Sequence, residues 1–262
     1  MDLALWTAKS GLEAHHQNIA IISNNLANAN TTGFKKNRPE FSDLAYQVLT
    51  QPGSATTEST NSPSGTVVGT GVKLSDNKKI FTDGSLVQTD NALDVSISGR
   101  GFLQVQIPNE STLAYTRAGS LQVNETGQLV LPNGYLLEPP ITIPQGAQKI
   151  SISEDGVVSV MTPGNTTPEQ IGTIQLSDFI NPGGLQPIGD NLYKETVASG
   201  NPTNGNPAGD GFGRLQQGTL ESSNVNIVEE MVNLIEAQRS FEVTSKAVSA
   251  IDSMLQNLTR EV

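Results

Sequence analysis

Residues 226–262 read NIVEEMVNLIEAQRSFEVTSKAVSAIDSMLQNLTREV, and this stretch decides the fold. Apolar residues recur in it at intervals of seven, at Ile227, Leu234, Phe241, Val248 and Leu255. A second row, three residues behind, becomes apolar towards the end: Glu230, Ala237, Thr244, Ile251 and Leu258. This period predicts an amphipathic helix with a packing seam. Asn226 followed by Glu229 fits a capping box at the start of the helix.

The first thirty residues carry the same repeat. Leu5, Leu12, Ile19 and Leu26 lie seven apart, and Ala8, His15, Ile22 and Ala29 follow three behind each. We therefore predict a first helix over residues 2–29, stopped at Thr31-Thr32-Gly33 with Gly33 in a left-handed conformation. The simplest partners for two such seams are each other and copies of the same chain. Neighbouring copies would then bury the remaining faces, such as Val228, Ile235 and Val243.

The sequence between the two helices has a different pattern. Residues 51–71 are rich in Gly, Ser, Thr, Pro and Asn, which is typical of a loop or linker. From residue 72 to 221, short apolar runs alternate with turn signals such as Asp155-Gly156, which predicts a domain of β-hairpins. Residues 199–213 are predicted to be a long loop.

The predicted fold class is therefore α+β, with terminal α-helices packing as a coiled-coil-like pair and an inserted all-β, hairpin-rich domain. The predicted domains are an N-terminal helix of an inner core domain (1–33), a linker and extended arm (34–71), a β-rich outer domain (72–221) and a C-terminal helix of the inner core domain (222–262). The predicted strands are 78–81, 86–88, 93–96, 102–106, 113–117, 121–123, 129–131, 141–143, 150–152, 157–161, 171–176 and 192–197.

Composition excludes several classes of function. The 262 residues include 35% hydrophobic and only 5% aromatic residues, which favours an elongated or assembling protein over one dense globule. The net charge of −11 disfavours binding to nucleic acid or to an anionic membrane. The absence of cysteine removes disulfides and thiol catalysis. We expect no transmembrane segment and no cleaved signal peptide.

No motif predicts catalysis, a cofactor or a metal. The pair His15-His16 lies on adjacent helical positions that point about 100° apart, so the two side chains are poorly placed to chelate one ion. Glu154-Asp155 precedes Gly156 and fits a hairpin turn. Gly99-Arg100-Gly101 does not complete a dinucleotide-binding fingerprint. We predict that the chain is not an enzyme.

Two long segments resemble the signatures of the bacterial flagellar rod and hook axial protein family. The first segment is Asn24-Asn25-Leu26-Ala27-Asn28-Ala29-Asn30-Thr31-Thr32-Gly33-Phe34-Lys35. The second is Ser222-Ser223-Asn224-Val225-Asn226-Ile227-Val228-Glu229-Glu230-Met231-Val232, continued by Ala237-Gln238-Arg239-Ser240-Phe241. Within this family the chain is most similar to the distal-rod subfamily, on its length and on Gly69-Thr70-Gly71-Val72, Gly99-Arg100-Gly101-Phe102 and Gln217-Gly218-Thr219-Leu220-Glu221.

The resemblance implies a structural subunit of the distal rod. Subunits of this family leave the cell unfolded through the flagellar type III export apparatus and stack into a rigid helical tube. The tube crosses the periplasm inside the L- and P-ring bushing and joins the proximal rod proteins to the hook protein. Neither nucleic acid nor membrane insertion is implied, and no cofactor is expected. The expected self-assembly interface consists of Leu5, Leu12, Ile19, Ile22, Leu26, Ile227, Met231, Leu234, Phe241, Val248, Ile251, Leu255 and Leu258.

Three other interpretations stay open on the sequence. The first is a proximal rod paralogue that shares both signatures. The second is a secreted β-rich enzyme, which would need a pocket with two facing carboxylates. The third is a soluble binding module whose terminal helices form a small closed oligomer. We also hypothesise that residues 47–65 become an ordered arm on a neighbouring subunit.

Overall fold

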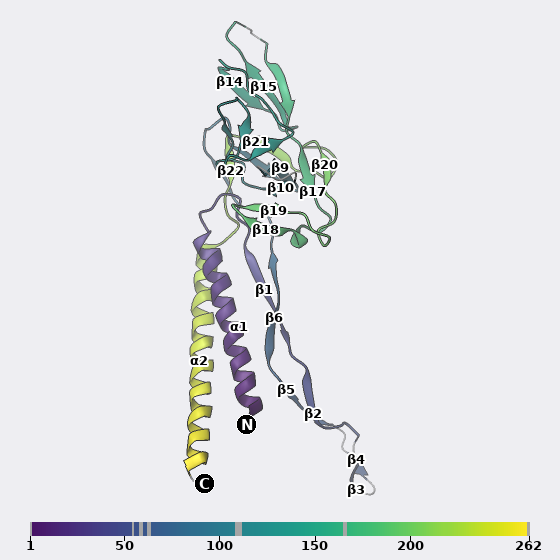
Figure 1. The fold of residues 1–262 in the computed structure, drawn as a ribbon, viewed down its shortest axis with the longest axis vertical. Coiled ribbons are helices and arrows are strands. Elements are labelled where there is room, and N and C mark those ends of the chain that lie inside the picture. The colour runs from purple at the N-terminus through teal and green to yellow at the C-terminus, as the bar shows by residue number, and fades with distance from the viewer. Residues whose placement is uncertain are drawn as a thin grey trace. The chain divides into compact units, whose positions relative to one another are not determined.

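The computed structural model describes residues 2–53, 55–57, 60–61, 64–107, 112–164 and 167–260. One helix lies at each end of the chain, and the strands lie between them in the sequence (Figure 1). The predicted fold class is confirmed: the structure is α+β, with two terminal helices and a β-rich central region. Within the described residues, neither helix combines the length and apolar character needed to cross a membrane.

The chain divides into two compact units. The first contains Met1–Ala27, Asn37–Lys78 and Asn226–Val262, and we call it the helix–ribbon unit. The second contains Asn28–Lys36 and Lys79–Val225, and we call it the β unit. This division differs from the predicted domain boundaries because residues 28–36 group with the strands and residues 37–78 group with the helices.

The helix–ribbon unit contains α1 (Asp2–Ala27) and α2 (Ile227–Arg260), which pack side by side in antiparallel directions (Figure 1). Asn226 caps α2, since its Oδ1 accepts hydrogen bonds from the amides of Val228 (3.1 Å) and Glu229 (3.4 Å). The cap confirms the predicted start of the second helix. The first helix ends at Ala27, two residues earlier than predicted, and Gly33 has the predicted positive φ of 71°.

The described residues between 37 and 79 form a two-stranded ribbon, in the region where the sequence predicts a linker and extended arm. β1 (Asn37–Asp43) pairs with β6 (Val72–Lys79), β2 (Tyr46–Thr50) with β5 (Thr66–Gly69), and β3 (Ala55–Thr57) with β4 (Thr60–Asn61). All five side chains of β2 are exposed. A ribbon with water on both faces needs no alternation of apolar and polar residues, so its sequence looks like a loop.

The β unit is built around an antiparallel sheet that has nine strands within the described residues. Seven follow one another in space: β11 (Gln122–Val123), β12 (Leu129–Val130), β13 (Leu136–Glu138), β9 (Phe102–Gln106), β10 (Leu113–Thr116), β19 (Leu192–Lys194) and β18 (Gln186–Gly189). β17 (Leu176–Asp178) pairs with β9 and with β20 (Thr203–Gly205).

Smaller sheets complete the β unit. β14 (Lys149–Ile152), β15 (Val157–Met161) and β16 (Glu169–Thr173) form one of them. β8 (Val95–Ser98) pairs with β21 (Arg214–Gln217), and β7 (Leu86–Gln88) pairs with β22 (Thr219–Glu221). A short 3₁₀ helix, η1 (Pro182–Gly184), precedes β18.

Several predicted strands are confirmed and others are wrong. Strands 86–88, 102–106 and 157–161 have the predicted bounds. Residues 141–143 are no strand: they make only one isolated bridge, between Thr142 and Gln128. The loop predicted at 199–213 contains β20. Polar strands such as β18, β20 and β21 were missed because they carry few apolar residues at alternate positions.

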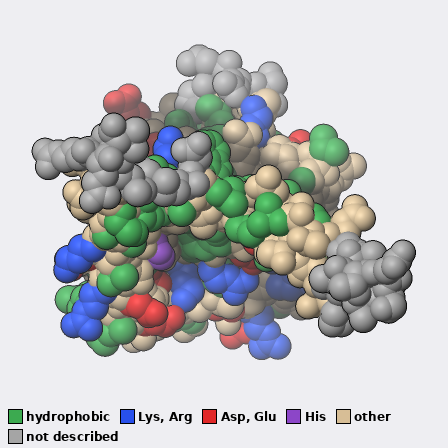
Figure 2. Space-filling view, turned by 90° about the horizontal axis from the view of Figure 1, so that it is seen from below, with side chains coloured by type: hydrophobic (Ala, Val, Ile, Leu, Met, Phe, Trp, Pro, Cys, Tyr) green, Lys and Arg blue, Asp and Glu red, His purple; other side chains and the backbone are tan. Residues whose placement is uncertain are grey.

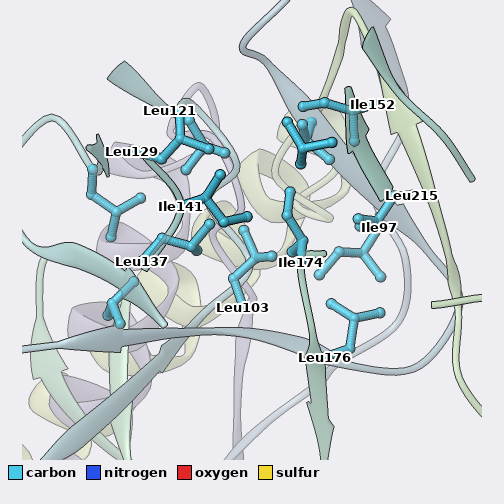
Figure 3. Packing of buried hydrophobic residues seen from close by; sticks show 14 of the residues in the cluster. Ile97, Leu103, Leu121, Leu129, Leu137, Ile141, Ile152, Ile174, Leu176 and Leu215 are labelled. Carbon is cyan, nitrogen blue, oxygen red and sulfur yellow. The ribbon is translucent and has the colours of Figure 1, made fainter. Parts of the chain in front are cut away.

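The main hydrophobic core lies inside the β unit. Aliphatic side chains from several strands converge there, among them Ile97, Leu103, Leu121, Leu129, Leu137, Ile141, Ile152, Ile174, Leu176 and Leu215 (Figure 3). A second, aromatic cluster contains Phe102, Tyr115, Phe179 and Tyr193. The Tyr115 and Phe179 rings meet edge to face, with centroids 4.8 Å apart. This geometry is favoured by the ring quadrupoles.

We expect Leu103→Ala to lower the free energy of unfolding by about 2–5 kcal/mol, because Leu103 is fully buried and the substitution leaves a cavity. The matched control is Val123→Ala, since Val123 is 41% exposed and its loss should change the value by about 0.5 kcal/mol or less. Urea unfolding followed by tyrosine near-UV circular dichroism measures both. Equal effects of the two substitutions would contradict the assignment of the core.

The aromatic cluster also predicts a loss of stability at alkaline pH. Burial raises the pKa of Tyr115 and of Tyr193 from 10 to about 12. Because the folded-state pKa is higher, each tyrosine contributes full stability below pH 10 and loses it as the pH rises towards 12. The difference corresponds to at most about 3 kcal/mol per tyrosine. We expect Tyr193→Phe to show a smaller fall in unfolding free energy between pH 9 and pH 12 than the unsubstituted chain; parallel curves would contradict this.

Candidate functional site: signature segments and assembly surfaces

Asn25, in the first signature segment, is a buried polar junction of the helix–ribbon unit. Its Nδ2 donates to the carbonyl of Asn37 (2.8 Å) and to Oε2 of Glu230 (3.3 Å). Its Oδ1 accepts a hydrogen bond from the amide of Asn37 (2.9 Å). One amide side chain therefore links α1, β1 and α2, and because the buried groups are satisfied, it fixes how these three elements align.

Lys35 and Glu221 form a buried ion pair in the β unit. Lys35 Nζ lies 2.5 Å from Glu221 Oε1, and both side chains are 0% exposed although the residues are 186 positions apart. Lys35 Nζ also donates to the carbonyl of Thr82 (2.7 Å), and Glu221 Oε1 accepts from the amide of Gly84 (2.9 Å). The pair thus holds three separate chain segments together.

Arg117 and Asp83 extend this pair to a charge-balanced group. Arg117 Nη1 lies 2.9 Å from Asp83 Oδ1 and 3.5 Å from Glu221 Oε2, and Nη2 donates to the carbonyl of Gly99 (2.7 Å). Burial lowers the pKa of Lys35, and the neighbouring Glu221 carboxylate opposes this shift. Two cations and two anions balance the charge of this group, in which Lys35, Glu221 and Arg117 are buried and the Asp83 side chain is 48% exposed. We call Lys35, Glu221, Arg117 and Asp83 the charge cluster.

Backbone and amide contacts around the charge cluster explain other signature residues. The amide of Gly33 donates to the carbonyl of Glu221 (2.8 Å), and a Cβ at Gly33 would lie 2.8 Å from the amide nitrogen of Ala118. Asn224 Oδ1 accepts from the amide of Lys36 (2.7 Å), while its Nδ2 donates to the carbonyl of Ile80 (2.8 Å). The backbone of Gly33 therefore binds the residue that precedes the second signature segment, and the side chain of Asn224 binds the residue that follows the first.

The remaining signature residues are divided between packing positions and the surface. Phe34 and Val225 are buried together with Ala29, and Ser223 Oγ accepts a hydrogen bond from the amide of Val225. The carbonyl of Thr32 accepts from Asn191 Nδ2. Leu26 and Asn28 are half-buried. The exposed members are Asn24, Ala27, Glu229, Gln238 and Arg239.

The residues predicted as a self-assembly interface are also divided. Ile22 is buried, and eight others are half-buried: Leu5, Leu12, Ile19, Leu26, Leu234, Phe241, Val248 and Ile251. Ile227 and Met231 are exposed. The side chains of Leu255 and Leu258 lie outside the described residues. The role of this set in contacts between copies stays a prediction.

α2 carries a second apolar stripe on the side opposite its half-buried seam. At about 100° per residue, Val228, Met231, Val232, Ile235 and Val243 share one face, and Leu234, Ala237, Phe241 and Val248 share the other. All five residues of the first set are exposed, and Val228 is 70% exposed. Figure 2 shows hydrophobic side chains at the surface beside charged ones in the view from below. We call these five residues the α2 stripe.

Three protein families match parts of the chain. The family of the flagella basal body rod protein matches residues 5–35, which include the first signature segment. The flagellar hook protein FlgE/F/G D1 domain matches residues 96–160. The flagellar basal body rod FlgEFG protein C-terminal family matches residues 216–261, which include the second signature segment.

Curated relatives match over almost the whole chain. The flagellar basal-body rod protein FlgG of Buchnera aphidicola subsp. Baizongia pistaciae is 48% identical over 98% of both chains. That of Caulobacter vibrioides is 47% identical over 97% of both, and that of Borreliella burgdorferi is 46% identical over 100% of both. This chain belongs to the FlgG family of flagellar basal-body rod proteins. Membership of the FlgG family assigns it a structural role in the rod of the flagellar basal body.

Sequence analysis missed the charge cluster and the Asn25 junction. Lys35 ends the first signature segment and Glu221 precedes the second. The signatures therefore located the region of the charge cluster but did not predict that these two residues form an ion pair. Glu230 stands at a seam position that is usually apolar. A polar residue there indicates a buried hydrogen-bond partner, and this could have pointed to Asn25. Within the described residues, no group of three His, Asp or Glu side chains has the arrangement of a metal site.

We expect Lys35→Met to lower the free energy of unfolding by about 3–5 kcal/mol, because it leaves the buried Glu221 carboxylate with only Arg117, 3.5 Å away, as a cation. The double variant Lys35→Met/Glu221→Gln should lose less than the sum of the two single variants, as a double-mutant cycle in urea would show. The control is Arg214→Ala, which removes an ion pair with Glu154 whose side chains are 71% and 70% exposed and should cost about 0–1 kcal/mol. Additive losses at Lys35 and Glu221 would contradict the assigned coupling.

Proposed function

We propose that this chain is the subunit of the flagellar distal rod, which polymerises into a rigid helical tube and transmits torque from the motor to the hook. The observation that carries the proposal is similarity to FlgG rod proteins along the whole chain, helices and β unit alike. Two further features support it. The α2 stripe offers a surface for neighbouring copies, and the two helices bring the ends of the chain into one packed element.

A helical lattice suits the transmission of torque. Every subunit makes the same heterologous contacts with its neighbours, and such contacts generate open filaments when the rotation does not close. The load is therefore shared over many equal interfaces. In this proposal the terminal helices form the inner core of the tube, and the β unit forms its outer wall. We propose no catalytic role and no cofactor for the chain.

The proposed location is the part of the rod that crosses the periplasm, between the proximal rod proteins and the hook protein and inside the L- and P-ring bushing. The chain would reach it through the type III export apparatus without cleavage of a signal peptide. Immunogold labelling of isolated basal bodies tests this location. Label between the ring region and the hook supports a distal rod subunit. Label confined to the membrane-proximal end of the rod would favour a proximal rod paralogue.

The ribbon is proposed to act as an arm that contacts a neighbouring subunit. Its outer part, β2 with β5, exposes the apolar side chains of Tyr46, Val48, Leu49 and Val67. Exposed apolar side chains on a paired ribbon are suited to docking against another protein surface. An arm of this kind would resist bending because it adds a further contact between each subunit and its neighbour.

We expect deletion of residues 47–68, with an Asn-Gly turn inserted, to leave export and assembly intact but to give rods that bend. The cut follows the register, in which Gln47 pairs with Val68, so the flanking pair of Tyr46 and Gly69 is kept. Asn-Gly supplies the positive φ angles of a two-residue hairpin turn. Electron microscopy of isolated hook–basal bodies measures the curvature of the rod. Straight rods after this deletion would contradict the role of the arm.

The matched control keeps the ribbon but changes its side chains. The triple variant Val48→Thr/Leu49→Thr/Val67→Thr preserves residues that favour strands while removing exposed apolar groups. Bent rods in both variants would assign the stiffening to contacts of these side chains. Bent rods in the deletion variant alone would assign it to the length of the ribbon.

A further inference from the structure

A groove lies between α1 and β6 within the helix–ribbon unit. It has a volume of ≈ 470 Å³. Trp6, Lys9, Glu13 and Gln17 line it from α1, and Val72, Lys73 and Leu74 line it from β6. Trp6 is 56% exposed although it is the single tryptophan of the chain. An apolar floor with charged residues at the rim is the usual composition of a docking groove.

The two walls of the groove are fixed against each other. Ser10 Oγ accepts a hydrogen bond from the amide of Val72 (3.3 Å), and Thr7 Oγ1 donates to the carbonyl of Gly69 (3.4 Å). Gly71 has a φ of 127°, and a Cβ there would lie 2.0 Å from Ser10 Oγ, so the ribbon backbone reaches α1 only because residue 71 is glycine. The groove is therefore preformed, which reduces the entropic cost of filling it.

The α2 stripe has the charge pattern that this groove requires. At about 100° per residue, Glu229 and Glu236 border one side of the stripe, while Arg239 and Glu242 lie within its width. The groove has a lysine on each wall, Lys9 on α1 and Lys73 on β6, and Glu13 also lies on the α1 wall. The acidic border of Glu229 and Glu236 would face a lysine wall, and Arg239 would face Glu13.

We propose that the groove between α1 and β6 of one copy receives the α2 stripe of a second copy. Groove and stripe are different surfaces of the same chain, so the contact is heterologous and repeats from copy to copy. The inference rests on the proposed function, because it names the surfaces through which neighbouring rod subunits meet. It assigns Trp6 the role of an apolar anchor beside Ile235, in keeping with the enrichment of tryptophan at the centres of interfaces.

The chain has no cysteine, so introduced thiols report this contact without background. The experiment combines Lys73→Cys in the groove with Cys at Val228, Met231, Val232 or Ile235 in turn, in cells where this chain is the sole FlgG-family rod protein. Isolated basal bodies are treated with a short bismaleimide and analysed on a denaturing gel. The matched control combines Lys73→Cys with Val123→Cys, an exposed position on the β unit.

The proposal predicts a ladder of dimers, trimers and larger species for at least one of the four stripe positions, and none for the control. Cells that carry the two single-cysteine chains together should give dimers and no larger species, because each copy then has only one thiol to link. Monomer at all four positions, in basal bodies that contain the chain, would overturn the proposed contact and leave the rod function standing. Absence of the unsubstituted chain from basal bodies would overturn the rod function itself.

If the cysteine variants do not assemble, charge reversal tests the proposed contact between the groove and the α2 stripe. Lys73→Glu and Glu236→Lys each place like charges together, and each should reduce the amount of chain in basal bodies about tenfold or more. The double variant restores opposite charges, so the amount of chain in basal bodies should recover most of the way to that of the unsubstituted chain. Equal loss in the double and single variants would overturn the proposal, whereas rescue distinguishes a direct contact from a general effect of charge.

Discussion

The buried ion pair of Lys35 and Glu221 is the interaction on which the arrangement of the β unit depends. Together with Thr82 and Gly84 it joins three segments of the β unit that are far apart in the sequence. Such a pair adds little net stability, since desolvation offsets most of the attraction, but removing one partner leaves a buried charge without compensation. Its contribution is therefore specificity. Only one arrangement of the three segments satisfies both charges, and the hydrogen bonds of Asn224 and Gly33 to the same segments reinforce that arrangement.

The sequence predicted those features that depend on local periodicity. The seven-residue repeat and the Asn226 cap defined α2, and strong alternation defined β9 and β15 with the observed bounds. Features that depend on partners distant in the sequence were not predictable in this way. Nothing near Lys35 specifies Glu221 as its partner, because the pairing arises from the whole fold. The ribbon was misread for a different reason: a strand exposed on both faces carries the composition of a loop, and its pairing is specified by register and turns instead of burial.

Glu230 shows why a polar residue occupies the seam of α2. An apolar residue there would pack as well but would allow neighbouring registers of the two helices. The hydrogen bond from Asn25 to the Glu230 carboxylate forms in one register, and Asn25 is itself fixed by the backbone of Asn37. Single polar residues at core positions of coiled coils select register in the same way. With the register fixed, the opposite face of α2 is fixed as well, so the seam determines where the α2 stripe is presented.

An exposed apolar stripe favours non-specific association with any apolar surface. A subunit of this kind therefore needs an interaction that disfavours association of free copies. The net charge of −11 supplies a repulsion that acts at distances up to the Debye length, about 8 Å at physiological ionic strength. Burial of apolar area acts only at contact, at about 25 cal/mol per Å². Random encounters bring acidic surfaces together and are repelled. In the proposed contact, the acidic residues beside the α2 stripe meet Lys9 and Lys73. The local electrostatic interaction is then attractive instead of repulsive, and the contact can form. In the proposed contact, specific assembly would follow from the positions of a few lysines on a chain whose net charge is negative.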